Sequence, residues 1–494
     1  MESNFTYNQN FGEHAIDAMF LLNRRQYDDG SKLPFRYQGM AGRASYSYSR
    51  RYIAEFNFGY NGSENFAPGK RYGFFPSVAA GWLLSEEKFM VPFKSTFSKV
   101  KLRGSYGLVG NDQLDGRRFA YITTIGDTDG YKWGVDNDYN RAGRREGDQG
   151  NSGLTWETVT KADIGLELGL WNTIELQADV FKEMRRDIFM QRKTIPGSSG
   201  FINAPWANFG KVDNKGIDMS IDINKQISND FFVSVRGTFT YAVNTIIEQD
   251  EPLSLRGTNR ESTGKSIGQI FGLVANGLFT NEDFTNIEQG TLAANIPLHT
   301  FGPVRPGDIK YKDINLDGRI DALDNCAIGG TYDPQMVYGF GANLKYKAFD
   351  LGFFFQGLGK SYRLIGGANF MPGSANGSMG NIFTNVVDRW TVENPRQDVF
   401  YPRLSDYQNA NNNQSSTWWL RDLSLLRLKN AEVGYNFPKN VLAKAYMSNA
   451  RIFVRGTNLL TFSKFKLWDP EVDAANGLRY PVMKSLSVGL EINF

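Results

Sequence analysis

The sequence predicts an all-β fold, an antiparallel transmembrane β-barrel wall of about 14–16 strands with short turns at one end and long loops at the other. Three observations support this prediction. Apolar and polar residues alternate with period two, many alternating segments are long enough to cross a bilayer, and the connectors alternate between short and long. No stretch approaches about 18 consecutive apolar residues, so the sequence offers no transmembrane helix.

The composition fits a β-sheet that has one face toward water and one apolar face toward lipid. Of 494 residues, 37 are Phe, 23 are Tyr and 52 are Gly, while hydrophobic residues make up only 41%. Because only every second residue of a membrane strand meets lipid, such a chain is rich in aromatic residues without being strongly apolar. The net charge of +3, with no basic run, does not indicate a nucleic-acid partner.

Residues that could carry catalysis are sparse. The single cysteine, Cys326, excludes an internal disulfide bond, and the histidines His14 and His299 are far apart in the sequence. Carboxylate pairs such as Glu86 and Glu87 have no evident partner base or nucleophile, and no phosphate-binding glycine loop is present. The sequence therefore does not predict an enzyme.

Period-two alternation defines the strands. In residues 160–170 one face is apolar, and it comprises Ala162, Ile164, Leu166, Leu168 and Leu170. The opposite face carries Lys161, Asp163 and Glu167. Many such runs reach roughly 9–13 residues, enough to cross a bilayer at a tilt. The predicted strands are 3–10, 14–23, 37–48, 52–60, 72–85, 99–109, 158–169, 172–184, 212–224, 231–246, 336–346, 350–360, 424–436, 450–458 and 484–494.

The connectors favour a membrane barrel over a soluble β-sandwich. Every second connector is short or of medium length, and the others are mostly long, including 110–157, 361–423 and a long insertion at 247–335. Membrane barrels have short periplasmic turns and long extracellular loops, whereas a sandwich has no reason to sort its loops in this way. The last predicted strand alternates in the same way and ends on Phe494, a pattern that resembles the terminal signal by which outer-membrane barrels are recognised for assembly. This resemblance implies that the last strand ends in the periplasm and that the short turns are periplasmic.

The N-terminus has no basic region followed by an apolar stretch, so it does not resemble a signal peptide. A barrel of the bacterial outer membrane needs such a peptide for export. An odd number of predicted strands also departs from the even counts of bacterial barrels. Either this chain is a fragment of a longer precursor that also supplies missing strands, or the prediction of a barrel is wrong.

Several segments resemble the SusC/RagA family of TonB-linked outer-membrane transporters. They are Gly73–Ser77 with Gly81-Trp82 and Ser85-Glu86, Phe56–Phe66, Lys101–Gly107, Leu154–Glu157, Trp419–Asp422 with Leu426–Asn430, and Arg455–Leu460. Together these motifs extend along essentially the whole chain, in order.

The resemblance implies that residues 1–494 form the C-terminal portion of a TonB-dependent barrel of about twenty-two strands. It implies uptake of oligosaccharides or peptides across the bacterial outer membrane, with a SusD-like outer-membrane lipoprotein as partner. TonB would act only through the plug of the missing N-terminal part, and lipid would surround the wall. The alternatives are a truncated barrel remnant that transports nothing and a secreted glycan-binding β-protein.

One local motif indicates a metal ion. Its residues have the spacing of a calcium-binding loop, with Gly318 at the position of the sharp turn, and its ligands would be Asp313, Asn315, Asp317, the Arg319 carbonyl, Asp321 and Asp324. The last position is Asp, as in dockerin-type loops, where Glu is usual. The alternative is an Asp-rich turn without an ion. The sequence thus predicts bound Ca²⁺ with a structural role.

Aromatic residues in the long loops are candidates for substrate contact, because their rings can stack on sugars or on peptide side chains. They are Tyr131, Trp133, Trp206, Trp418, Trp419 and Trp468. The alternative for each is packing within the loops or a place in the aromatic girdle at the membrane surface.

Overall fold

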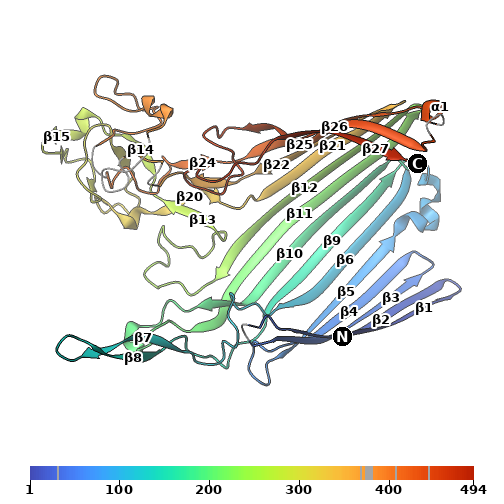
Figure 1. Cartoon of the computed structure of the whole chain (residues 1–494), viewed down its shortest axis with the longest axis horizontal. Helices are drawn as coiled ribbons and strands as arrows, with labels where there is room; N and C mark the ends of the chain where they lie inside the picture. The colour runs from blue at the N-terminus through green and yellow to red at the C-terminus, as the bar shows by residue number, and fades with distance from the viewer. Residues whose placement is uncertain (31–32, 368–369, 373–381, 406–408, 443–445) are drawn as a thin grey trace. The chain divides into compact units, whose positions relative to one another are not determined.

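The computed structural model describes residues 1–494 except 31–32, 368–369, 373–381, 406–408 and 443–445. Its contacts divide the chain into two compact units, one of Met1–Ile223 with Ala242–Leu253 and one of Asn224–Tyr241 with Ser254–Phe494. Each unit is built on long antiparallel strands that follow one another in chain order (Figure 1). Among the described helices, none is both long and apolar enough to cross a membrane.

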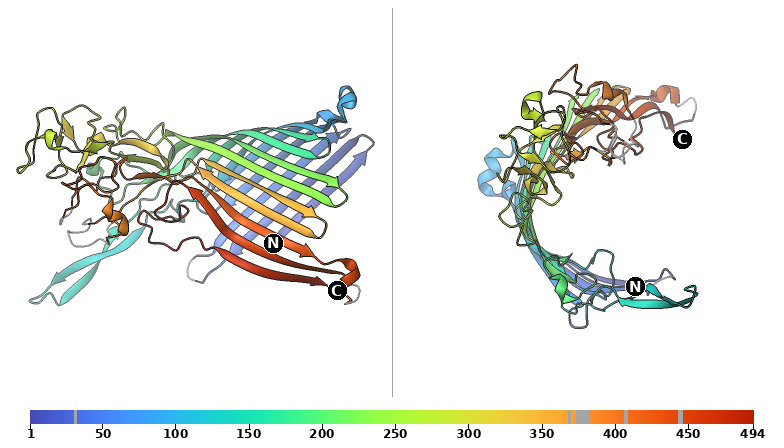
Figure 2. Two further views of the ribbon diagram at one scale, coloured as in Figure 1. Left: turned by 90° about the horizontal axis from the view of Figure 1, so that it is seen from above. Right: turned by 90° about the vertical axis from the view of Figure 1, so that its left-hand side faces the viewer.

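Nine long strands belong mainly to the first unit, and they lie side by side in both views of Figure 2. They are β1 (Glu2–Phe11), β2 (His14–Tyr27), β3 (Phe35–Tyr48), β4 (Tyr52–Ser63), β5 (Tyr72–Leu83), β6 (Phe97–Asn111), β9 (Glu157–Leu170), β10 (Ile174–Gln191) and β11 (Trp206–Ser228). The second unit has six long strands, and they are β12 (Phe231–Glu248), β21 (Met336–Tyr346), β22 (Phe349–Gly359), β25 (Leu425–Asn436), β26 (Asn449–Ser463) and β27 (Ser485–Asn493).

Each of the fifteen predicted strands coincides with one of these strands, so the predicted antiparallel β fold is confirmed. The largest differences in length concern β11, β26 and β10, predicted as 212–224, 450–458 and 172–184. In the structure β10 and β11 extend further toward the long loops, because Arg185, Arg186 and Asp187, and Lys211 before the predicted start of β11, interrupt the apolar periodicity there while the backbone pairing continues.

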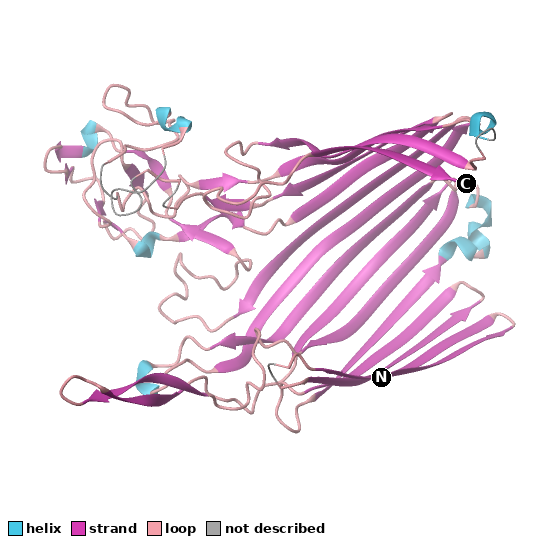
Figure 3. Ribbon diagram, in the orientation of Figure 1, coloured by secondary structure: helices cyan, strands magenta, loops and turns pink. Residues whose placement is uncertain are grey.

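The predicted sorting of the connectors is also confirmed. Tight turns join β9 to β10 and β21 to β22, and left-handed backbone at Trp171, Asn172 and Lys347 reverses the chain there. The medium connectors carry short helical segments, namely η1 (Leu84–Glu86) and η2 (Lys88–Phe93) in one and α1 (Lys439–Leu442) in the other (Figure 3). The remaining 3₁₀ turns lie in long connectors, and they are η3 (Gly197–Ser199), η4 (Asn281–Asp283), η5 (Ala322–Asp324) and η6 (Thr384–Val387).

The long connectors contain short strand pairs that the sequence did not predict. In the first unit, β7 (Ile125–Trp133) pairs with β8 (Tyr139–Glu146) as a hairpin. The pairs of the second unit are β13 (Gln269–Gly272) with β20 (Cys326–Thr331), β14 (Ala275–Leu278) with β18 (Ile309–Tyr311), β15 (Phe284–Asn286) with β16 (Thr291–Leu292), β17 (Leu298–His299) with β19 (Arg319–Ile320), and β23 (Tyr362–Leu364) with β24 (Leu420–Asp422).

The described residues of two of these connectors, 254–335 and 360–424, pack on each other and form what we call the loop lobe of the second unit. Its apolar core is assembled from both connectors, with contributions from Leu278, Ile320, Trp390, Tyr401 and Trp419. All five side chains are at most 7% exposed. The long insertion at 247–335 is therefore a folded element and not an open loop.

The long strands themselves have two different faces. Residues that pair directly across neighbouring strands share a face, and such pairs link Phe56 to Val78, Val78 to Tyr106 and Tyr106 to Ala162. The first three of these side chains are 44–57% exposed. An apolar face that no protein covers is what a strand wall presents to lipid.

Candidate functional site

The opposite face of the first unit is lined by ion pairs. Lys99 and Lys101 reach Glu167 at 2.7 and 3.2 Å, and Lys161 reaches Glu183 at 2.7 Å. Each pair joins two neighbouring strands, which is the arrangement that stabilises a sheet through its side chains. The face predicted to be polar is therefore polar, and its charges are largely neutralised within the wall.

One pair on this face spans three strands. Arg103 of β6 and Asp179 of β10 lie 2.7 Å apart, although β9 runs between their strands. Gly165 of β9 pairs with both residues, and it has no side chain to separate them. Asp218 of β11 lies directly opposite Asp179 and continues the polar row.

In the second unit, polar and charged residues of the long strands line a cavity of about 690 Å³. Arg451 contacts both Asp350 and Glu432, and its distance to the Glu432 carboxylate is 2.5 Å. Arg236, which the sequence placed on the polar face, lines the same cavity. Positively and negatively charged side chains both line this cavity, so it has no strong preference for an anion or a cation.

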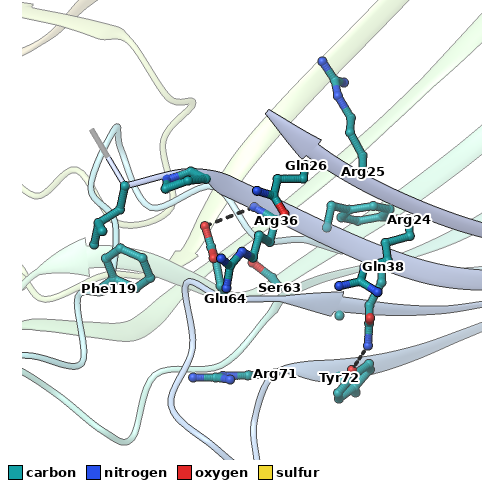
Figure 4. A pocket seen from close by; sticks show the side chains of 14 residues that line it. Arg24, Arg25, Gln26, Arg36, Gln38, Ser63, Glu64, Arg71, Tyr72 and Phe119 are labelled. Atoms are coloured by element: carbon teal, nitrogen blue, oxygen red, sulfur yellow. Dashed lines mark hydrogen bonds between the residues drawn. The ribbon is translucent and has the colours of Figure 1, made fainter. Parts of the chain in front are cut away.

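A second cavity, of about 430 Å³, lies where β2, β3, β4 and β5 meet their long loops (Figure 4). Four arginines line it, namely Arg24, Arg25, Arg36 and Arg71. We call it the arginine cavity. Its only lining carboxylate is Glu64, among the lining residues that the structure describes.

The charge of Glu64 is already engaged. Its carboxylate pairs with Arg118 and accepts the backbone N–H of Arg36 at 3.2 Å. The guanidinium of Arg71 donates to the Phe66 carbonyl, whereas those of Arg24 and Arg36 have no carboxylate partner within the described residues. The arginine cavity is therefore an anion-attracting site. Sequence reasoning missed it, because these arginines come together only through strand pairing.

Two of the predicted substrate-contact residues form an exposed platform. Tyr131 and Trp133 lie on the β7–β8 hairpin, 73% and 41% exposed, with ring centroids 5.8 Å apart in a stacked arrangement. Tyr139 extends the stack, with its ring 5.9 Å from that of Trp133. We call these three rings the aromatic platform. Exposed stacked rings can bind a flat apolar surface such as a sugar face.

The other four predicted contact residues are packed inside the protein. Trp419 is 3% exposed and donates its ring N–H to the Asn412 carbonyl at 2.7 Å. Trp418 donates to the Phe400 carbonyl, and both tryptophans belong to the core of the loop lobe or pack against it. Trp468 also packs against this core.

Trp206 lies in the first unit, stacked on Phe189 with 4.7 Å between ring centroids. The guanidinium of Arg117 covers its other side at 3.8 Å. Both faces of the indole are thus occupied by other side chains. For Trp206, as for the three tryptophans of the second unit, the structure shows contacts within the protein.

The calcium-like loop is a compact turn. Asp313 accepts the backbone N–H groups of Leu316 and Gly318, at 2.6 and 2.8 Å. Asp317 accepts that of Arg319 at 2.8 Å, and the left-handed backbone at Gly318 makes the predicted sharp turn. The carboxylate oxygens thus curl inward onto the loop.

The last predicted calcium ligand closes this loop. Asp324 is fully buried and accepts the N–H groups of Ile314 and Asp321, at 2.8 and 2.9 Å. Asp321 caps η5 through the N–H of Leu323, and Asn315 donates to Asp317. Among the residues that the structure describes, no three acidic, His or Cys side chains converge on one point that would hold a metal.

His299 packs beside this loop, on β17, which pairs with β19 of the calcium-like motif. Its Nε2 accepts the Tyr311 N–H at 3.1 Å, and its Nδ1 lies 3.1 Å from the Pro297 carbonyl. The proton therefore sits on Nδ1, and a second proton on Nε2 would face an N–H donor. Burial lowers the pKa of His299 to about 4.

Comparison with known proteins gives a consistent assignment. Residues 3–459 match the family model described as TonB dependent receptor-like, beta-barrel. TonB-dependent receptor P26 of Formosa agariphila is 29% identical over 482 residues, covering 93% of this chain and 46% of that protein. TonB-dependent receptor SusC of Bacteroides thetaiotaomicron is 25% identical over 469 residues, covering 92% of this chain and 43% of that protein. The chain thus spans about half the length of these relatives.

The fold is also similar to the solved structure of the RagAB peptide transporter. The match has a TM-score of 0.77 at 19% sequence identity and covers 100% of this chain and 55% of the other. At this level of identity the likeness concerns the fold alone. It confirms the antiparallel strand wall that the sequence predicted.

Proposed function

Because this chain belongs to the TonB dependent receptor-like β-barrel family, we propose that it forms much of the wall of an outer-membrane importer. Members of this family are outer-membrane transporters and receptors, so the chain is an outer-membrane protein and not an enzyme. This location argues against the alternative of a secreted glycan-binding protein. The observation that carries the proposal is the two-faced wall, with exposed Val78 and Tyr106 on one face and paired Arg103 and Asp179 on the other.

The direction of import follows from the connectors. We propose that the long loops, including the loop lobe and the aromatic platform, lie outside the cell, where they meet the substrate. The short turns would then face the periplasm. Energy from TonB would reach the wall through a plug supplied by the N-terminal half of the protein, since the relatives are about twice as long as this chain.

The partner that we propose is a SusD-like lipoprotein seated on the outer loops. This proposal is supported by similarity to SusC and to the RagA part of the RagAB fold. The loop lobe offers such a partner a surface with its own rigid core, because Asp308 at its centre is fully buried and bound by Arg403. A rigid surface loses little entropy when a partner docks on it.

The proposed substrates are oligosaccharides or peptides. The aromatic platform supports this class, because Tyr131 and Trp133 expose stacked rings that suit a sugar face or a peptide side chain. RagAB, which shares the fold, is named as a peptide transporter. That description belongs to the other protein, so uptake measurements have to separate the two substrate classes for this one.

We also propose that the loop from Asp313 to Asp324 binds Ca²⁺ and stabilises the loop lobe. The spacing of its oxygen donors is that of a calcium loop, and the sharp turn at Gly318 is present. Binding would require the inward-curled carboxylates of Asp313 and Asp317 to exchange backbone N–H groups for the ion. The role of the ion would be structural, since the loop is part of the lobe.

The proposal of import is tested by deleting the coding region and supplying defined glycans or peptides as the sole carbon source. We expect growth on one of these classes to fail and to return when the intact protein is supplied. A complementing variant with Tyr131→Ala and Trp133→Ala should restore less uptake than one with Val135→Ala on the same hairpin. Unchanged growth on every glycan and peptide would contradict import and favour a non-transporting remnant.

A further inference from the structure

The two faces of the β7–β8 hairpin carry different side chains. This hairpin extends beyond the long strands of the first unit (Figure 1). Residues that pair directly across two strands share a face, and the direct pairs of the hairpin include Trp133 with Tyr139 and Tyr131 with Arg141. Arg141 therefore lies on the same face as the three rings of the aromatic platform.

A second arginine continues this face along β8. Side chains alternate between the two faces of a strand, so Arg145, four residues after Arg141, points to the same side. The alternation is unbroken on β8, because the irregular register of the hairpin comes from an extra residue of β7 between Thr128 and Tyr131. At about 3.4 Å per residue, the two arginines stand roughly 13 Å apart along the strand. We call the face that contains Tyr131, Trp133, Tyr139, Arg141 and Arg145 the platform face.

The strip between the two arginines carries little side-chain bulk. Gly143 lies between them on β8, and Gly126 is the residue that pairs with Arg145. Thr128, which pairs with Gly143, adds only a small side chain. A ligand can therefore lie close to the backbone in this strip and reach both guanidinium groups.

Both arginines of the platform face are exposed and available to an anion. Neither Arg141 nor Arg145 forms an ion pair or a side-chain hydrogen bond with a residue that the structure describes. On the opposite face, by contrast, Arg144 is paired with Asp127. Glu146, two residues after Arg144, also lies on that opposite face. The other carboxylates of the hairpin stand in its bulge and its turn, at Asp129, Asp136 and Asp138.

We propose that the platform face binds an acidic oligosaccharide, one that carries carboxylate or sulfate groups. Tyr131 lies directly opposite Arg141, so a ring for stacking and a guanidinium for an anion are neighbours. An acidic sugar residue presents an apolar ring face and a charged group in one unit, and guanidinium groups bind such oxyanions in a bidentate fashion. A second acidic residue further along the same oligosaccharide would reach Arg145.

An acidic peptide is the competing occupant, and the platform face favours the sugar. A peptide carries its rings and its carboxylates on different residues, and specific peptide binding uses separate pockets for alternate side chains. The rings of Tyr131, Trp133 and Tyr139 instead form one continuous surface, with neighbouring centroids 5.8 and 5.9 Å apart. This inference rests on the proposed function, because it names the substrate class of the platform that import would use.

The test uses protein purified in detergent from outer membranes. The probes are tetragalacturonate and a sulfated galactan tetrasaccharide, and their carboxyl-reduced and desulfated forms are the neutral counterparts. We expect at least one acidic probe to bind more tightly than its neutral counterpart and to lose affinity as the salt concentration rises.

The double variant Arg141→Gln/Arg145→Gln should bind that acidic probe about tenfold more weakly, since hydrogen bonds to charged groups are strong. It should bind the neutral counterpart as the parent protein does. Arg141→Lys/Arg145→Lys keeps the charge but loses the planar fork, so it should retain only part of the affinity. Unchanged heat-modifiable gel mobility would show that the variants are folded.

The matched control is Lys132→Gln/Arg144→Gln, which removes two positive charges from the opposite face of the same hairpin. It should bind the acidic probe as the parent protein does. Equal losses in the control would overturn the proposal, as would equal affinity of the parent protein for the acidic and neutral probes. Competition by oligoglutamate at the affinity of the acidic probe would assign the platform face to acidic peptides and overturn it as well.

Failure of this inference can be told apart from failure of import. A neutral glycan or peptide whose binding is weakened by Tyr131→Ala and Trp133→Ala, but not by Arg141→Gln/Arg145→Gln, would remove the acidic class and leave import standing. Unchanged growth of the deletion strain on every glycan and peptide would instead contradict import itself.

Discussion

Arg103 of β6 and Asp179 of β10 form a salt bridge of 2.7 Å across the intervening strand β9. The bridge passes over Gly165, where an added Cβ would lie 2.1 Å from Asp179 Oδ1 and 2.9 Å from Arg103 Nε. The missing side chain at Gly165 is therefore the condition that allows one ion pair to tie three strands together on the polar face.

Replacing Gly165 with Ala should displace this bridge and lower the stability of the wall by about 1 kcal/mol, a modest value because Arg103 is partly exposed. The measurement is the temperature at which the detergent-solubilised protein loses the electrophoretic mobility of its folded form, which we call its folded gel mobility. In an Asp179→Asn background the same substitution should cost less, because the bridge is already weakened. An equal cost in both backgrounds would show that the bridge is not what Gly165 protects.

The loop lobe should lose stability in acid through His299. Burial lowers the pKa of this residue to about 4, from an ordinary 6.5. Between these values the unfolded chain binds a proton that the folded lobe does not, so stability falls as the pH drops from about 6.5 to about 4 and does not change through this residue above that range. Melting followed by tryptophan fluorescence should show this slope, and His299→Gln should flatten it, while a slope of equal size in the variant would contradict the assignment.

Asp308 should be essential to the loop lobe. It is fully buried, accepts two hydrogen bonds from Arg403 at 3.1 Å each, and accepts one each from Asn409 and Asn412 at 2.9 Å. Asp308→Ala leaves these donors without their acceptor, which should cost the lobe about 3 kcal/mol. Limited proteolysis should then cleave the lobe while the wall keeps its folded gel mobility.

The exposed Glu282 offers a matched control for this experiment, because Glu282→Ala also removes a carboxylate from the lobe. Its protease pattern should equal that of the parent protein. If Asp308→Ala also leaves the lobe resistant, the buried network does not hold the two connectors together.

The aromatic platform should affect ligand binding without affecting folding. Tyr131→Ala and Trp133→Ala each remove a ring that is exposed in part or in most of its area, so each should weaken a stacking ligand severalfold, by about 1 kcal/mol. Equilibrium binding of glycans and peptides to the purified protein measures this loss. Val135→Ala, at a fully exposed position of the same hairpin, should have no effect. A loss of folded gel mobility in the ring variants would indicate a structural role instead.

Calcium should raise the melting temperature of the loop lobe if the loop from Asp313 to Asp324 binds it. Asp317→Ala removes one proposed ligand and should abolish that increase, while melting in the presence of a chelator should be little changed between parent and variant. Absence of any calcium-linked shift in the parent protein would remove the proposal and leave the motif as an Asp-rich turn.

The long strands could be predicted from the sequence because their periodicity is a local property. The limits of β10 and β11 could not, because the charged residues Arg185, Arg186 and Asp187, and Lys211 before the predicted start of β11, interrupt the apolar alternation that identifies a strand. In the structure the backbone pairing of the two strands continues to Gln191 and Trp206.

The fold of the loop lobe could not be predicted from periodicity, for a different physical reason. Its strands are as short as two residues, as in β17 and β19, and have no periodicity to detect. Its central contact joins Asp308 to Arg403, 95 residues apart. Burial of Trp419 in the lobe depends on this long-range packing. The residues next to Trp419 in the sequence therefore do not indicate whether its ring is buried or exposed.

The separation of Asp308 from Arg403 also constrains biogenesis. Between these residues lies the hairpin of β21 and β22, whose turn at Lys347 is at the end opposite to the lobe. If the lobe lies outside the cell, each of its halves must be delivered there separately, and the contact between them can close only after the hairpin has been threaded through the membrane. Formation of the contact between Asp308 and Arg403 would then indicate that this part of the chain has been inserted in its final topology.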